Sequence, residues 1–406
     1  MRRNLFIGLI VLTAMTMAAP AMATNGTNLI GVGSISRSMG GVGVAAPQDA
    51  ISAVFANPAA MCMGPYCPGS QADFDATFFK PTVKATITTP GGTINVESQM
   101  EPFIIPAVGI STPISDKLRF GFGAYGVSGM GVDYRDIIDL DPGTPGPQGE
   151  IFTMYQVMRF APNLAWLVSP NFSLGANLQI VYASLDLGGG TSHNYATGVQ
   201  LGGMYRIGET HIGLSYTTEE SIDHDRVMDT DMSGLGDATL ALSSPQSVVA
   251  GVSFEQIKNL LVEFNVKWYN WADADGYKDF DWEDQTVYAI GGQYKLPSGW
   301  AFRAGYNFAK SPVKEHNGWT AFSAPGPPPV LTPEFGQEYL RVIGLPAVVE
   351  SHVTLGLGYE FSERFQATFG YMHAFSNDIT ETSVDGVILK SELEEDSFDF
   401  GLKWTF

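Results

Sequence analysis

The sequence predicts an all-β fold, a transmembrane antiparallel β-barrel of about fourteen strands. Apolar and polar residues alternate in many short segments, as in residues 172–185, which is typical of strands that face lipid on one side and a lumen on the other. The export signal described below is followed by no uninterrupted apolar stretch of about 18 residues, which excludes a transmembrane helix. The chain also contains 46 glycines and 12% aromatic residues, as a barrel with many turns and aromatic girdles would.

The first residues have the order of a secretory signal. Arg2 and Arg3 precede an apolar run over residues 5–17, and Ala21-Met22-Ala23 offers a cleavage site, so we expect residues 1–23 to be removed. Loss of the two arginines lowers the formal charge from -20 to -22. A chain this acidic lacks the basic surface that nucleic acid binding requires, so we expect no nucleic acid partner.

Residues 36–60 are nearly all small. Gly40, Gly41 and Gly43 allow a backbone with positive φ, and Asp49 is a suitable N-cap for a helical turn over residues 50–56. The turn should end before Pro58, because the residue that precedes a proline avoids the α region. This segment has too little apolar mass to fold alone, so we expect it to pack inside the barrel.

The run from Arg37 to Ala45 and the motif Asn57-Pro58-Ala59 together resemble the N-terminal hatch of the FadL-type family. Members of that family are outer-membrane channels for long-chain fatty acids and other hydrophobic compounds. The resemblance implies three parts in this chain: a signal peptide (1–23), a hatch or plug in the lumen (24–70) and a transmembrane β-barrel (71–406).

The barrel strands are expected in regular order along the chain. They are predicted at residues 72–87, 96–111, 118–133, 153–168, 172–185, 196–207, 211–219, 244–257, 260–272, 282–296, 300–310, 350–361, 364–377 and 397–406. The turns after residues 168, 207, 257, 296 and 361 are short, whereas residues 134–152, 221–242, 273–281, 311–349 and 378–396 form long loops. We assign the short turns to the periplasm and the long loops to the outside.

Alternation fails in the third strand, where Gly126, Ser128, Gly129 and Gly131 follow one another closely. Glycines within a strand mark a bulge or a bend. In the FadL-type family an inward kink of the third strand opens the wall sideways, and the Asn-Pro-Ala motif lies against it. We therefore expect a lateral opening here, with Asn57 bonded to the backbone groups that the kink frees. Alternatively, these glycines only accommodate the curvature of the barrel.

Ligand-binding residues are harder to predict. Phe55 and Phe79 are candidates for an inner pocket. The loop at residues 320–349, with a proline-rich stretch followed by Leu331 and Phe335, is either an apolar outer groove or a stiff polyproline cover over the mouth.

Cys62 and Cys67 are the only cysteines. In an exported protein they favour a disulfide that clamps a small loop, with free thiols or a metal as alternatives. The six histidines fit no catalytic motif, so we predict no enzyme and no cofactor. The acidic loops lack the spacing of a calcium loop and are interpreted as solvated surface, with a divalent-ion site as the alternative.

These observations predict passive uptake of hydrophobic compounds across the outer membrane of a Gram-negative bacterium, with fatty acids preferred over aromatic hydrocarbons. The alternatives are a cation-preferring porin for polar solutes and a structural or adhesive surface barrel. The expected partners are the hydrophobic ligand, outer-membrane lipid and lipopolysaccharide. The terminal strand ending at Phe406 also resembles the signature by which the barrel-assembly machinery is thought to recognise its clients. We expect a monomer.

Overall fold

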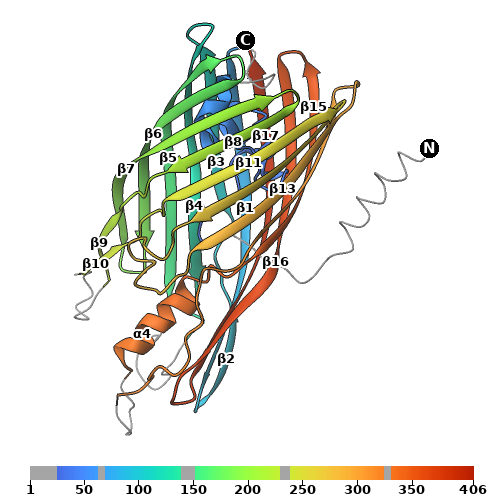
Figure 1. The fold of residues 1–406 in the computed structure, drawn as a ribbon. Helices are drawn as coiled ribbons and strands as arrows, with labels where there is room; N and C mark the ends of the chain where they lie inside the picture. The colour runs from blue at the N-terminus through green and yellow to red at the C-terminus, as the bar shows by residue number, and fades with distance from the viewer. Residues whose placement is uncertain (1–24, 63–68, 139–150, 229–237, 324–330) are drawn as a thin grey trace.

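A computed structural model describes residues 25–62, 69–138, 151–228, 238–323 and 331–406. Its main feature is a closed barrel of fourteen antiparallel strands, which confirms the predicted fold class (Figure 1). The barrel closes where β1 pairs with β17, from Gln71 opposite Thr405 to Thr88 opposite Ile388. The predicted signal peptide, residues 1–23, lies outside the described residues.

The barrel strands follow one another around the wall in chain order. They are β1 (Gln71–Thr89), β3 (Phe103–Pro113), β4 (Leu118–Asp133), β5 (Phe152–Ser169), β6 (Phe172–Asp186), β7 (Thr191–Ile207), β8 (Thr210–Thr217), β11 (Ser247–Ile257), β12 (Leu260–Tyr269), β13 (Gln285–Lys295), β14 (Trp300–Ala309), β15 (Ser351–Ser362), β16 (Phe365–Thr382) and β17 (Ile388–Thr405).

Two predicted elements are wrong. Residues 96–111 form no single strand: β2 (Gly92–Glu97) forms a hairpin with the outer end of β1, and β3 begins only after Pro102, which cannot donate to a ladder. Residues 378–396 are not a loop, because they complete β16 and begin β17. On β17 the acidic side chains of Glu392, Glu394 and Asp396 face outward, while Leu389 and Leu393 face inward and are buried.

The two faces of the wall differ as the alternation predicts. On β6 the outward side chains Leu174, Leu178 and Ile180 are exposed, whereas the inward side chains Asn177 and Gln179 are buried. The protein thus presents an apolar outer surface to lipid and a polar inner surface to the lumen.

The N-terminal segment, residues 25–61, is buried almost throughout. It contains α2 (Ser34–Arg37), α3 (Ala50–Ala56) and the start of the short helix η1 (Pro58–Cys62), and the Asp49 side chain caps α3 by accepting from the Ser52 N–H at 2.7 Å. Inward-facing glycines let this backbone approach the wall: a Cβ on Gly213 would lie 2.0 Å from the Val44 carbonyl oxygen, and one on Gly305 would lie 2.1 Å from the Gly40 nitrogen.

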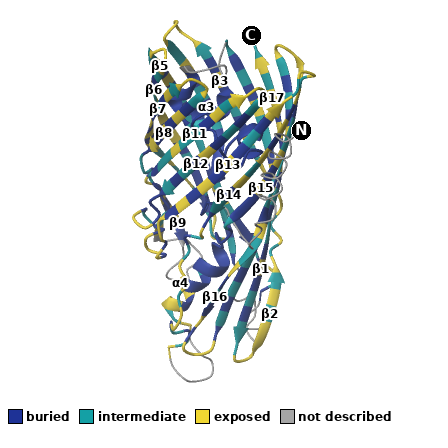
Figure 2. Ribbon diagram, turned by 45° about the vertical axis from the view of Figure 1, so that its right-hand side comes forward, coloured by how far each residue is buried: buried dark blue, intermediate teal, exposed yellow. Residues whose placement is uncertain are grey.

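At the outer end, β1, β2, β16 and β17 extend beyond the other strands (Figures 1 and 2). Here α4 (Pro333–Tyr339) and η3 (Leu340–Gly344) pack against them, and β9 (Asp223–Met228) pairs with β10 (Ala238–Ala241) in a separate hairpin. Among the described residues no helix is both long and apolar enough to cross a membrane.

Candidate functional site

The barrel wall is interrupted between β3 and β4. Their inner halves pair up to Ala107 opposite Tyr125. Further out, β4 continues to Asp133 and pairs only with β5, while residues 103–106 of β3 pair only with β1. The gap closes at its outer end, where the Gln99 N–H donates to the Asp133 carbonyl at 2.9 Å. We call this gap, between residues 103–106 and 126–132, the window.

The bend in β4 lies where the sequence predicts it. The register with β5 shifts between Gly126 and Ser128, which marks a bulge. Gly126 permits the close approach of the two edges, because a Cβ there would lie 2.4 Å from Cγ2 of Ile105. A larger residue at position 126 would therefore push β3 and β4 apart.

The backbone groups of the bent strand find partners in the N-terminal segment. The Leu29 N–H donates to the Val127 carbonyl at 2.9 Å, and the Gly129 N–H donates to the Thr27 carbonyl at 3.2 Å. The Ser128 hydroxyl also donates to the Thr27 carbonyl, at 2.9 Å. Residues 27–29 thus replace part of the ladder that β3 no longer supplies.

The expectation that Asn57 serves the kink is wrong. Its Nδ2 donates to the carbonyls of Val44 and Gly203, at 2.8 and 3.2 Å, and its Oδ1 accepts from the Ala59 N–H at 3.0 Å. Pro58 and Ala59 begin η1, which packs mainly against β5, β6 and β7. The Asn57-Pro58-Ala59 motif therefore fixes the end of α3 against another part of the wall.

A cavity of about 140 Å³ lies behind the window. Four predicted kink residues line it, namely Gly126, Ser128, Gly129 and Gly131. Most of the other walls are apolar and include Phe79, Val83, Ile105, Met130, Val157 and Leu393. Glu395 is the one charged side chain among the lining residues, and Pro346 and Ala347 also line the cavity. The cavity is thus an apolar chamber that adjoins the lipid-facing wall.

The two predicted pocket residues do not meet in one pocket. Phe79 lines the chamber, whereas Phe55 lines a second cavity of about 50 Å³. Leu29 and Val127 line both cavities, so they separate the chamber from the second cavity. The sequence could not distinguish the two positions, because their relation depends on the path of the N-terminal segment.

The second cavity is polar, and two basic side chains, Arg159 and Lys267, line it. Arg159 pairs with Glu220 at 2.7 Å. Lys267 is buried, and its ammonium donates to the carbonyls of Ile30 and Gly41, at 2.6 and 3.0 Å. It forms no ion pair with another described residue. A small anionic group would therefore find a positive charge in this cavity.

The described parts of the predicted outer loop, residues 320–323 and 331–349, form a cover over the outer end of the lumen. Phe335 is 6% exposed and stacks on Tyr339, so it belongs to the core of the cover and does not line an open groove. Leu331 is exposed, and the proline-rich residues 324–330 lie outside the described part of the chain. Pro346 and Ala347, which follow η3, bring this cover to the chamber.

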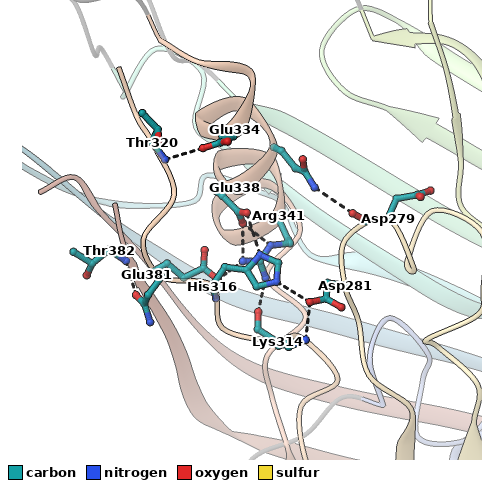
Figure 3. Close-up of polar contacts among 12 residues, drawn as sticks. Asp279, Asp281, Lys314, His316, Thr320, Glu334, Glu338, Arg341, Glu381 and Thr382 are labelled. Carbon is teal, nitrogen blue, oxygen red and sulfur yellow. Dashed lines mark hydrogen bonds and ion pairs between the residues drawn. The ribbon is translucent and has the colours of Figure 1, made fainter. Parts of the chain in front are cut away.

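An ionic latch holds the cover in place (Figure 3). The Arg341 guanidinium is buried between Glu338, at 2.7 Å, and Glu381 of β16. The His316 ring lies between Glu338, 3.0 Å from Nδ1, and Asp281, 3.1 Å from Nε2. Hydrogen bonds from Lys314 and His316 hold the pKa of Asp281 below its usual value. The latch thus joins the cover to β16 and to the loop between β12 and β13.

Two buried contacts fix the N-terminal segment to the wall. The Glu263 carboxylate of β12 accepts from the N–H groups of Gly43, Ala45 and Ala46, at 2.9–3.1 Å. On the other side, Arg37 donates to Asp399 of β17 at 2.8 Å. These acids and residues 27–29 were missed by sequence reasoning, because their partners are distant in the chain and no local pattern marks them.

The predicted Cys62–Cys67 disulfide falls outside the described residues, because residues 63–68 and the Cys62 side chain are not described. The proposed pairing therefore stays a prediction.

Comparisons with known proteins agree with this architecture. The family model described as outer membrane protein transport protein (OMPP1/FadL/TodX) matches residues 9–192 and 189–321. The toluene transporter TodX of P. putida superposes with a TM-score of 0.67 at 18% identity, covering 93% of this chain and 99% of TodX. A FadL homologue of Pseudomonas aeruginosa gives 0.69 at 15% identity, covering 96% and 100%. The toluene transporter TbuX of Ralstonia pickettii gives 0.61 at 15% identity, covering 93% and 98%. No curated protein matches the chain.

Proposed function

The chain belongs to the OMPP1/FadL/TodX family of outer membrane transport proteins, and on this premise we propose that it releases hydrophobic compounds sideways through the window. It is an outer-membrane barrel of a Gram-negative bacterium and a channel for hydrophobic compounds. The finer proposal concerns the route and the ligand. The observation that carries it is the apolar chamber behind a gap in the wall.

The route follows from the chemistry of the chamber. Transfer of a hydrophobic molecule from water to an apolar surface is favourable, by about 25 cal/mol per Å² of apolar area removed from water. Ile104, at the edge of the window, is 65% exposed on the lipid-facing side. A ligand that passes from the chamber over Ile104 would therefore stay on apolar surface and need not cross the polar lumen. This step requires no energy source and no cofactor.

The chamber favours neutral ligands. Its lining carries a carboxyl group, Glu395, and no lysine or arginine, so a ligand carboxylate would meet repulsion there. Its volume of about 140 Å³ is close to that of an engineered apolar cavity of about 150 Å³ that binds benzene. We therefore rank monoaromatic hydrocarbons above long-chain fatty acids, which reverses the order that the sequence suggested. Two of the similar structures are named toluene transporters.

Fatty acids remain a second candidate because of the second cavity. The Lys267 ammonium there could hold a carboxylate, while the hydrocarbon tail would extend toward the chamber past Leu29 and Val127, which line both cavities. A Lys267→Met variant separates the two ligands: oleate uptake should fall and toluene uptake should persist if fatty acids use this cation.

In this proposal the N-terminal segment acts as a plug. It carries polar contacts to strands on several sides of the lumen, which supports a blocked channel over the rival cation-preferring porin. We propose that the protein works as a monomer in contact with outer-membrane lipid and lipopolysaccharide, after insertion by the barrel-assembly machinery. Single-channel recordings test the rival, since a porin would pass large, steady ion currents and a plugged channel would not.

Blocking the window tests lateral release. Gly129 lines the chamber and is exposed, so Gly129→Trp should place an indole in the window and remove most protein-dependent uptake of radiolabelled toluene. Gly203→Trp is the matched control, because a Cβ at this position of β7 meets only Leu174, at 3.8 Å. Normal uptake by a folded Gly129→Trp barrel would contradict lateral release. Absence of protein-dependent uptake by the unmodified protein would favour the adhesive or structural role, in which the window is inert.

A further inference from the structure

The outer face of β16 and β17 changes character along its length. Toward the inner end, Phe369, Phe398 and Phe400 point outward and are exposed, which suits contact with lipid. Further out, the same face presents His373, Glu394 and Asp396. Inward neighbours such as Met372 and Ser397 are buried, so the polar group lies on the outside of the barrel.

These three side chains form a compact cluster. His373 and Asp396 face each other in the β16–β17 register, with Nδ1 and Oδ1 3.0 Å apart. One ligand atom from each of His373, Glu394 and Asp396 lies within 4.8 Å of the other two. The side chains of His373 and Asp396 are 28% and 34% exposed, so the cluster is accessible but not fully solvated. The Tyr371 hydroxyl donates to Asp396 at 2.7 Å and holds this carboxylate in place.

The ladder beneath the cluster is incomplete. The β16–β17 register shifts between Ala374 and Asn377, and Glu394 has no register partner on β16. Lys80 of β1 lies opposite Asp396 in the ladder, but Lys80 forms no ion pair with any described residue. Two carboxylates therefore face one imidazole at a bulge, with no lysine or arginine paired to either acid among the described residues.

We propose that His373, Glu394 and Asp396 bind a divalent transition-metal cation, with Zn²⁺ as the representative. A set of one imidazole and two carboxylates suits such a cation, because imidazole is a good ligand for Zn²⁺ whereas Ca²⁺ takes oxygen ligands. The bound cation joins β16 to β17 across the bulge and leaves coordination positions open toward the outside. This site is separate from the window and does not depend on the proposed transport function.

Zn²⁺ titration of the purified full-length barrel, in a phosphate-free detergent, tests the site. Calorimetry should show one saturable Zn²⁺ site, with much weaker binding of Ca²⁺. His373→Gln and Asp396→Asn should each weaken Zn²⁺ binding by at least about 10- to 100-fold, the loss that changes beside metal ligands already cause. Asp378→Asn is the control, because Asp378 lies on the same strand and pairs with Lys390 at 3.2 Å, away from the cluster.

Each outcome decides the proposal. Absence of saturable Zn²⁺ binding by the unmodified protein would overturn it, as would equal affinities in His373→Gln and Asp378→Asn. Binding that is equally strong for Ca²⁺ and independent of His373 would show an unspecific acidic surface. The heat-dependent gel migration of each variant reports whether the barrel is folded, and toluene uptake should be unchanged in all of them.

Discussion

The outer half of β4 and the outer halves of β16 and β17 differ in how completely their backbones pair with neighbouring strands. The outer part of β4 has a strand partner on one side only and carries Gly126, Gly129 and Gly131. The outer part of β17 pairs with both β1 and β16, and its inward residues Leu389 and Leu393 are buried in an apolar cluster with the cover.

The difference shows how a barrel can be opened without being unfolded. Where the wall is complete, ladder pairs and apolar burial stabilise it together. At the window the same ladder groups are freed, and residues 27–29 of the N-terminal segment take their place. An opening in a membrane wall is thus possible only where an internal segment satisfies the exposed backbone.

The largest effect should come from removing the ion pair between the N-terminal segment and β17. Arg37 is 1% exposed and pairs with Asp399 of β17, so Arg37→Met leaves a buried carboxylate without its cation. We expect a loss of about 3–5 kcal/mol in the free energy of unfolding, measured by urea denaturation. The double variant Arg37→Met/Asp399→Asn should recover part of this loss. A single variant as stable as the unmodified protein would contradict the assigned role.

Truncation of the apolar cluster compares the two regions directly. Leu389→Ala removes a fully buried side chain and should cost about 2–5 kcal/mol. Ile104→Ala at the window removes a side chain that is 65% exposed and should change stability by about 0.5 kcal/mol or less. Equal losses by urea denaturation would mean that the window is packed as tightly as the closed side.

A smaller effect is expected from the backbone bonds at the window. Leu29→Pro removes the N–H that donates to the Val127 carbonyl and should cost about 1–3 kcal/mol locally. Hydrogen exchange at the Gly129 amide, which donates to Thr27, should become faster. Leu29→Ala keeps the N–H and serves as the control. Unchanged exchange in the proline variant would show that β4 keeps its bend without the N-terminal segment.

The smallest effect concerns the β9–β10 hairpin of the outer loops. Burial lowers the pKa of His224 from 6.5 to about 4, so the folded hairpin holds the neutral ring. Between these values the unfolded hairpin binds the proton and the folded one does not, so local stability falls as the pH drops from about 6.5 toward 4. Limited proteolysis of the hairpin should therefore accelerate at pH 5 relative to pH 7. His224→Phe should remove this difference, and a difference that persists would contradict the assignment.

Much of the fold could be predicted because polar and apolar residues alternate along each membrane strand, a pattern that is visible in a short stretch of sequence. Period-two alternation located fourteen strands, and the predicted bounds of β4 agree with the structure. The alternation rule failed at residues 378–396, which are strand and not loop. Outward-facing acidic residues give this segment the polar composition of a loop, although the buried Leu389 and Leu393 alternate with them. Gly126 to Gly131 marked the bend, since only small residues allow the close contact with Ile105.

The sequence by itself determined the alternating wall, the export of the chain and the place where one strand bends, since each depends on residues close together in the chain. Only the tertiary structure decided which groups meet across the lumen. Gly129 donates to Thr27, and the Ala45 N–H donates to Glu263, because the wall closes around the N-terminal segment. Contacts of this kind depend on closure and register, which no local pattern encodes.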